Sequence, residues 1–107
     1  MRLSASLSLI VSALLISSTL ASGLTDDRKI ELRNLVLQDC GSCHGMTMKG
    51  GLGSALTPAK LDDADVAALA SIILDGVPGK PMPPWRGLIN ENEAKWIAEA
   101  LKNGQIR

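Results

Sequence analysis

Both cysteines and the only histidine of this 107-residue chain lie within residues 40–44, which read CGSCH. The pattern C-x-x-C-H is typical of c-type haem attachment, in which two thiols one helical turn apart bind the two vinyl groups of one haem. The adjacent imidazole then reaches the iron as an axial ligand. We therefore predict one haem c per chain, bound covalently through Cys40 and Cys43, with His44 as a ligand of the iron.

Three other uses of this cluster are less favoured. A disulfide between the two cysteines would close a very small loop and stabilise little, because the entropic gain grows with loop length. A thioredoxin-like redox pair normally lies in a βαβ unit, and no segment of this chain alternates like a strand. A zinc ion would find only three ligands and no second Cys/His cluster. A haem-free thiol–disulfide protein remains the alternative.

The poverty in aromatic residues agrees with a cofactor in the core. The chain is 46% hydrophobic but only 2% aromatic, with two tryptophans and neither phenylalanine nor tyrosine. A domain this small commonly relies on a disulfide, a metal or a cofactor for stability. A porphyrin would supply the missing aromatic volume, so we expect the haem-free chain to be at best loosely folded. The formal net charge of zero excludes a strongly basic surface for nucleic acid.

The beginning of the chain resembles a secretory signal peptide. A single arginine precedes an uncharged, apolar run over residues 3–20, and small residues that suit a signal peptidase follow. A membrane anchor is the alternative, but the run is diluted by serines, is short for a span and is followed by acids. We predict a cleaved segment 1–23, an exported domain 24–107 and no stable membrane anchor.

The remaining sequence predicts an all-α domain of three main helices and two irregular loops. A Gly-rich stretch at 45–57 and a Pro-rich stretch at 77–85 suit neither helices nor central strands. The predicted helices run from a cap at Thr25 to Cys40, from a cap at Asp62 or Asp63 to Asp75-Gly76, and from a capping box of Asn90 and Glu93 to Asn103-Gly104.

The second axial ligand of the iron has to be a residue other than histidine. Met46 and Met48 follow His44 so closely that their side chains would have to pass around the porphyrin edge to reach the opposite face. Met82 comes much later, in a loop whose prolines lower the entropic cost of holding a thioether on iron. We therefore predict Met82 as the ligand, with core packing as its alternative role, and we interpret Met46 and Met48 as packing residues.

Three segments together resemble the class I monohaem cytochromes c: CGSCHG at 40–45, GLGSAL at 51–56 and KPMPPW at 80–85. Within that family, the run 35–45 and the LDG…PMPPW pattern over 74–85 are similar to the NirC-type cytochromes. These are small periplasmic proteins encoded with cytochrome cd1 nitrite reductase in denitrifying bacteria. The resemblance implies the small all-α cytochrome c fold around one haem, and a periplasmic location.

The resemblance also implies roles for individual residues. It makes the two cysteines the thioether attachments, His44 the proximal ligand and Met82 the distal ligand. Relatives have a proline whose carbonyl accepts the N–H of the proximal imidazole; this chain has Ser54, whose backbone carbonyl can do the same. Either Trp85 or Arg86 could donate a hydrogen bond to a haem propionate, or serve as an ordinary packing or surface residue.

A haem with both axial positions filled has no open site for a substrate, so we expect an electron-transfer protein rather than an enzyme. The resemblance implies electron donation to cytochrome cd1 nitrite reductase, supplied by an upstream periplasmic or membrane donor. The alternative is an accessory role in haem d1 biosynthesis or in maturation of the reductase, with its maturation factors as partners. We expect a monomer that binds no nucleic acid.

Overall fold

The structure is a computed structural model and describes residues 23–107, so the predicted signal segment lies, apart from Gly23, outside the described residues. No strand occurs between residues 23 and 107, which confirms the predicted all-α class. The elements in chain order are α1 (Asp26–Leu35), the π-helical turn η1 (Val36–Cys40), α2 (Gly41–His44), α3 (Pro58–Leu61), α4 (Val66–Asp75) and α5 (Glu91–Lys102).

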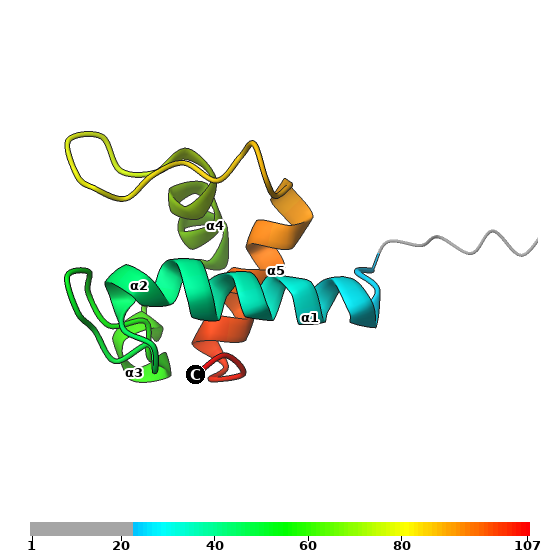
Figure 1. Ribbon diagram of the computed structural model, residues 1–107, viewed down its shortest axis with the longest axis horizontal. Coiled ribbons are helices and arrows are strands. Elements are labelled where there is room, and N and C mark those ends of the chain that lie inside the picture. Colours follow the sequence, from blue (N-terminus) through cyan, green and yellow to red (C-terminus); the bar gives the residue numbers. More distant parts are fainter. Residues whose placement is uncertain (1–22) are drawn as a thin grey trace, which may run out of the picture.

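The first three elements form one continuous helical rod (Figure 1). The Thr25 side chain caps it as predicted, accepting a hydrogen bond from the backbone N–H of Arg28 at 3.1 Å. The predicted end at Cys40 is wrong, because the rod continues through the CGSCH motif to His44. It ends where Gly45 takes a φ of +91°, a conformation that glycine adopts without strain. The motif is therefore presented by a helix.

The middle of the chain differs from the predicted pattern at one cap. Asp65, rather than Asp62 or Asp63, caps α4, and its carboxylate accepts the N–H of Ala68 at 3.0 Å. The short helix α3 before it was not predicted, because four residues are too few for a helical period. Its local signal was a Thr57 cap followed by proline at the first helical position.

The last helix begins as predicted. The Asn90 side chain accepts the N–H of Glu93 at 2.9 Å, and the Glu93 carboxylate accepts the N–H of Asn90 at 3.0 Å. Helix α5 packs against α4, contacts α3 and crosses α1, so the core lies around it (Figure 1). The core cluster is aliphatic apart from one methionine and consists of Leu32, Val36, Met48, Leu61, Ala70, Leu74, Ile89, Ala94, Ile97, Ala100, Leu101 and Ile106.

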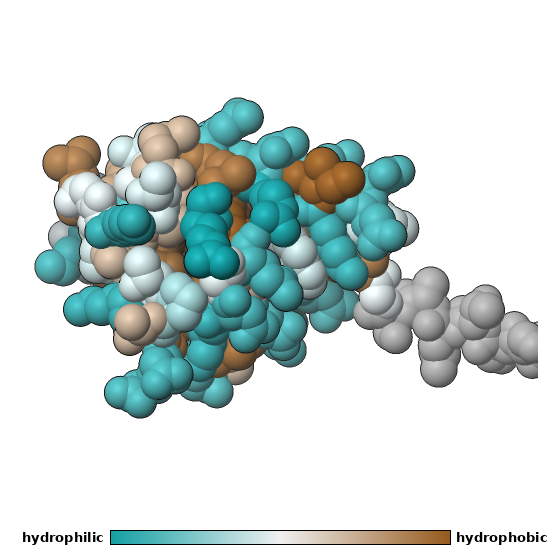
Figure 2. All heavy atoms as spheres, turned by 90° about the horizontal axis from the view of Figure 1, so that it is seen from below, coloured by the Kyte–Doolittle hydropathy of each residue, from teal (hydrophilic) through white to brown (hydrophobic). Residues whose placement is uncertain are grey.

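The surface is mainly hydrophilic on the face shown in Figure 2, with hydrophobic atoms visible between the polar side chains. Both tryptophans, Trp85 and Trp96, are only partly buried and pack at the edge of the core cluster. The aliphatic core contains no aromatic side chain among its fully buried members. This agrees with the inference from composition that the chain itself supplies no large aromatic group to the interior.

An ion pair joins the first and last helices. The Arg28 guanidinium on α1 contacts the Glu93 carboxylate on α5 through Nε at 2.7 Å and Nη2 at 3.2 Å. Glu93 is 8% exposed. The hydrogen bonds from Arg28, aided by the Asn90 N–H, hold the pKa of Glu93 below its usual range. Glu93 thus serves the helix cap and the contact between helices with one carboxylate.

Replacing Glu93 with glutamine should lower the free energy of unfolding by about 1–2 kcal/mol at neutral pH, since charged hydrogen bonds are lost. The folded-state pKa of Glu93 is depressed, so its contribution is present above the unfolded pKa of about 4.3 and is lost as pH falls through the folded value. The difference between wild type and variant in urea unfolding should therefore shrink below about pH 4. The exposed Glu99→Gln serves as the control; a constant difference down to pH 3 would contradict the assignment.

Candidate functional site

The two thiols of the motif lie on successive turns of the same helical rod. Cys40 is partly buried, Cys43 is exposed, and the two are not joined in a disulfide. Burial, together with the nearby Asp39 carboxylate, raises the pKa of the Cys40 thiol to about 11. Before haem attachment the Cys40 thiol is therefore shielded, whereas Cys43 is open to an approaching reactant.

The imidazole of His44 is held by the chain in a defined orientation. Its Nδ1 atom lies 2.7 Å from the backbone carbonyl oxygen of Ser54. A carbonyl only accepts hydrogen bonds, so Nδ1 carries the proton, and the lone pair of Nε2 is left free to bind a metal. This contact between His44 and Ser54 is the one that the resemblance to cytochromes c implied.

The Gly-rich loop folds back onto the end of the rod to make this contact possible. The N–H groups of Gly50 and Gly53 donate to the carbonyls of His44 and Cys43, each at 2.8 Å. These two bonds satisfy carbonyls that a helix end leaves free. A Cβ atom on Gly53 would lie 2.8 Å from Nδ1 of His44, which is too close for a real contact. The absence of a side chain at position 53 therefore lets the loop lie against the imidazole.

The two methionines after the motif have different environments. Met48 is 1% exposed and has a φ of +59°, rare for a residue with a side chain. Its N–H donates to Gly45 at 2.9 Å and its carbonyl accepts from Leu56 at 2.8 Å, so the loop holds it in place. Met48 is a packing residue, as predicted. Met46 is 62% exposed, so the described chain does not bury it.

Met82 lies in the loop between α4 and α5, which in the view of Figure 1 projects from the side of the molecule where α2 lies. Its side chain is partly exposed and is absent from the core cluster. Its carbonyl accepts the N–H of Val77 at 3.2 Å. The structure therefore does not support core packing as the role of Met82, and its thioether is not used in the core cluster.

Trp85 and Arg86, the two residues suggested as hydrogen-bond donors to a haem propionate, have different environments. Trp85 is partly buried, and its backbone N–H donates to Leu74 at 3.0 Å. Arg86 donates from Nε and Nη2 to the two carboxylate oxygens of Asp75, at 2.8 and 2.9 Å. These bonds lower the pKa of Asp75 and raise that of Arg86. Sequence reasoning missed Asp75; the available signal was that opposite charges flank the Pro-rich loop.

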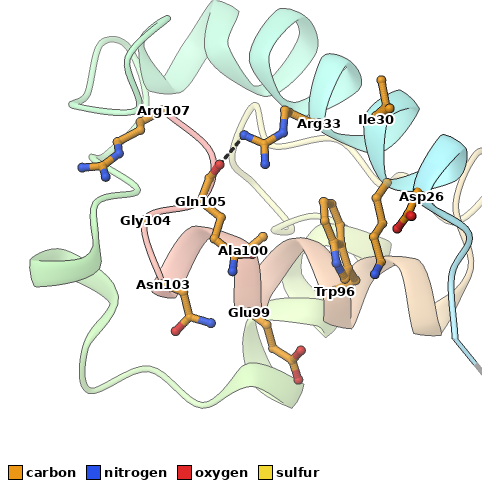
Figure 3. Close-up of a pocket in the computed structure, with 11 residues that line it drawn as sticks. Asp26, Ile30, Arg33, Trp96, Glu99, Ala100, Asn103, Gly104, Gln105 and Arg107 are labelled. Carbon is orange, nitrogen blue, oxygen red and sulfur yellow. Dashed lines mark hydrogen bonds between the residues drawn. The ribbon is translucent and has the colours of Figure 1, made fainter.

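A separate groove of 1020 Å³ lies between α1 and the end of α5 (Figure 3). Trp96 and the exposed Ile30 line it, and at one side Arg33 donates a hydrogen bond to the carbonyl of Gln105. None of the residues predicted for the site lies in this groove. The predicted residues lie instead in η1 and α2, in the Gly-rich loop, and in the segment between α4 and α5.

Comparison with known proteins gives the family. The profile of the family described as cytochrome C oxidase, cbb3-type, subunit III matches residues 29–99. Cytochrome c55X of Paracoccus denitrificans is 52% identical over 88 residues, covering 81% of this chain and 85% of the relative. Cytochrome c55X of Pseudomonas aeruginosa is 47% identical over 89 residues, covering 78% and 75%. The chain belongs to the class I cytochromes c.

Two solved structures are similar in fold. The c-type cytochrome NirC aligns with a TM-score of 0.76 and 46% identity, over 78% of this chain and 98% of its own. The dihydro-heme d1 dehydrogenase NirN, in complex with DHE, aligns with a TM-score of 0.60 and 30% identity. That match covers 64% of this chain and 15% of NirN. The chain is thus a small cytochrome c close to NirC.

Membership of this family implies a covalently bound haem c and a role in electron transfer. The residues fit such a group, because two unpaired thiols lie beside an imidazole whose Nε2 is free. The family assignment favours haem attachment over thiol–disulfide exchange. Across residues 23–107, the helices are too short or too polar to cross a membrane.

Proposed function

We propose that this cytochrome carries single electrons in the periplasm through one haem c, attached at Cys40 and Cys43 and ligated by His44 and Met82. The proposed recipient is cytochrome cd1 nitrite reductase. The observation that carries the haem part of the proposal is the 2.7 Å contact between Nδ1 of His44 and the Ser54 carbonyl, and the similarity to NirC supports the choice of recipient. The contact directs the only histidine of the chain to act as a ligand through Nε2.

The haem would supply an iron that exchanges one electron, and the chain would set how readily it does so. The hydrogen bond to Ser54 makes the His44 imidazole more electron-donating and fixes its orientation. The thioether of Met82 would favour ferrous iron and so raise the reduction potential. If the His44 imidazole and the Met82 thioether both held the haem, this chain would leave no open site for a substrate, which would suit a carrier.

The surface around the motif suits a brief encounter with a partner. Cys43 is exposed, and Leu52 on the neighbouring loop is 94% exposed. Lys49 and Lys80 are also exposed, and we propose that they lie at the rim of the docking surface. Redox partners commonly meet through small interfaces. Without segment 1–23, which contains Arg2, the formal net charge would be 10 − 11 = −1, so any salt dependence of the association rate should come from the lysines at the rim rather than from the net charge.

A second candidate function is favoured by the similarity to NirN. That protein is described as a dihydro-heme d1 dehydrogenase, and its cytochrome-like part is 30% identical to this chain. A dehydrogenase has to pass on the electrons that it removes, and a one-electron carrier could receive them. This cytochrome would then serve haem d1 biosynthesis or maturation of the nitrite reductase rather than its turnover.

Stopped-flow mixing separates the two candidates. The reduced holoprotein is mixed with oxidised, haem d1-loaded cytochrome cd1 nitrite reductase, and oxidation of its haem is followed by absorbance. For the donor role we expect a second-order rate constant of roughly 10⁵–10⁷ M⁻¹s⁻¹.

A gene-deletion strain provides the second measurement. If the donor role is correct, reductase purified from it should contain its normal haem d1. A negligible rate in stopped flow, together with reductase that lacks haem d1, would overturn the donor role and support the maturation role.

A further inference from the structure

We propose that Arg86 is a positioning residue for Met82 and acts through its paired hydrogen bonds to Asp75. The proposal rests on the proposed function, because it presumes that the Met82 thioether is a ligand of the iron. It concerns how the Met82 loop, residues 76–85, is held at its two ends.

The ion pair closes the base of the Met82 loop. Asp75 is the last residue of α4, and Arg86 directly follows the loop. Two parallel contacts, 2.8 Å from Nε and 2.9 Å from Nη2, join the side chains. Backbone bonds reinforce the closure, since the N–H groups of Trp85 and Arg86 donate to the Leu74 carbonyl at 3.0 and 3.1 Å.

The closed base is in direct contact with the backbone of Met82. Gly76, the residue after Asp75, has a φ of +68°, and a Cβ there would lie 2.6 Å from the Met82 carbonyl oxygen. That same oxygen accepts the N–H of Val77 at 3.2 Å. The backbone of Met82 thus packs against the first residues of its own loop. A shift at the base therefore moves Met82 itself.

The sequence of the loop transmits such a shift to the ligand. Pro81 precedes Met82 and two prolines follow it, so few backbone angles near the methionine can change to absorb a displacement. Arg86 is also held from its other side, because its Nη1 lies 3.7 Å from the Glu91 carboxylate at the start of α5. The arginine thereby ties the loop to both helices that flank it.

Solvent exposure limits what this pair can do for overall stability. The Arg86 and Asp75 side chains are 53% and 57% exposed. Exposed ion pairs contribute little to folding, but paired arginine–carboxylate contacts define geometry well. The expected consequence of breaking the pair is therefore a looser Met82, with little change in global unfolding.

A different role for Arg86, a hydrogen bond to a haem propionate, makes a distinct prediction. In that role Arg86→Gln removes the donor itself, whereas Asp75→Asn only loosens the arginine, so Arg86→Gln would have clearly the larger effect on the haem environment. In the proposed role, the two side chains act as a unit, so either substitution has the same effect. The double variant then changes the haem environment no more than either single variant does.

The test is an imidazole titration of the ferric holoprotein, followed by visible absorbance and by the far-red charge-transfer band of methionine-ligated haem. The variants are Asp75→Asn, Arg86→Gln and the double variant, with Arg86→Lys as the conservative substitution. We expect the apparent dissociation constant for imidazole to fall about two- to five-fold in both single variants, and equally in the double. The apparent dissociation constant of the Arg86→Lys variant should lie between those of the wild type and of Arg86→Gln. The midpoint of thermal unfolding should be nearly the same in all variants.

The control is Glu91→Gln, which removes the weaker contact of Arg86. It should change the dissociation constant for imidazole less than Asp75→Asn or Arg86→Gln does. An effect of Arg86→Gln clearly larger than that of Asp75→Asn would overturn the proposal in favour of the propionate contact, and no effect in either would overturn it outright. Failure of the proposed ligation is separately visible. In that case the wild type lacks the methionine band, and Met82→Ala binds imidazole as the wild type does.

Discussion

Replacing Met82 with alanine is expected to open the haem iron of the holoprotein to external ligands. Added imidazole should bind the ferric form at least about tenfold more tightly than it binds wild type, because no thioether competes for the position. Carbon monoxide should bind the ferrous form, and the reduction potential should fall, since methionine favours ferrous iron. Ligand titrations and a redox titration of the purified holoprotein measure these effects.

The choice of control for this experiment follows from the structure. Met46 is 62% exposed, so Met46→Ala removes a thioether near the motif without disturbing the core. Met48 is unsuitable, since it is 1% exposed and its truncation would cost about 2–5 kcal/mol of stability. Equal imidazole binding by the Met82→Ala and Met46→Ala variants would count against Met82 as the ligand.

Substituting Gly53 with alanine should greatly reduce the amount of correctly assembled holoprotein. The added Cβ would lie 2.8 Å from Nδ1 and 2.9 Å from Cε1 of the His44 ring, so the ring or the loop has to move. Either movement disrupts the 2.7 Å contact with the Ser54 carbonyl. The expected result is a severalfold lower haem content per chain, measured by haem stain that survives denaturing electrophoresis.

Gly87 provides a matched glycine for comparison. A Cβ at that position would meet nothing within 4 Å, and the residue does not have a positive φ. Gly87→Ala should therefore load haem as the wild type does. If Gly53→Ala loads haem equally well and keeps the absorption spectrum of the wild type, the contact between His44 and Ser54 does not direct the imidazole.

Local sequence signals predicted those parts of the fold that depend on near neighbours. The caps at Thr25 and Asn90 were predicted because a side-chain oxygen satisfies an N–H two or three residues away. The end of α4 at Gly76 was predicted for a similar reason. The cap of α4 was placed too early, because aspartates stand at 62, 63 and 65 and the unpredicted helix α3 has its C-cap at Asp62, which leaves Asp65 to cap α4.

In the candidate site, too, local sequence signals predicted some features and left others to the tertiary structure. The CGSCH motif predicted a haem c, which the family assignment supports, because this spacing of residue types has few other uses. Ligation of the iron by His44 and Met82 stays a prediction. The continuation of the helix through His44 was not predicted. It depends on the returning Gly-rich loop, whose N–H groups satisfy the last helical carbonyls.

The sequence by itself thus determined the chemistry of this protein: two thiols and one imidazole within five residues, one distant thioether, and a core short of aromatic groups. Only the tertiary structure decided how these groups are oriented. The resemblance to cytochromes c pointed to the Ser54 carbonyl, but only the structure places it 2.7 Å from Nδ1 of His44, and only the structure pairs the Asp75 carboxylate with Arg86. Backbone carbonyls occur at every position and exposed carboxylates at many, so only their placement in space selects the ones that act.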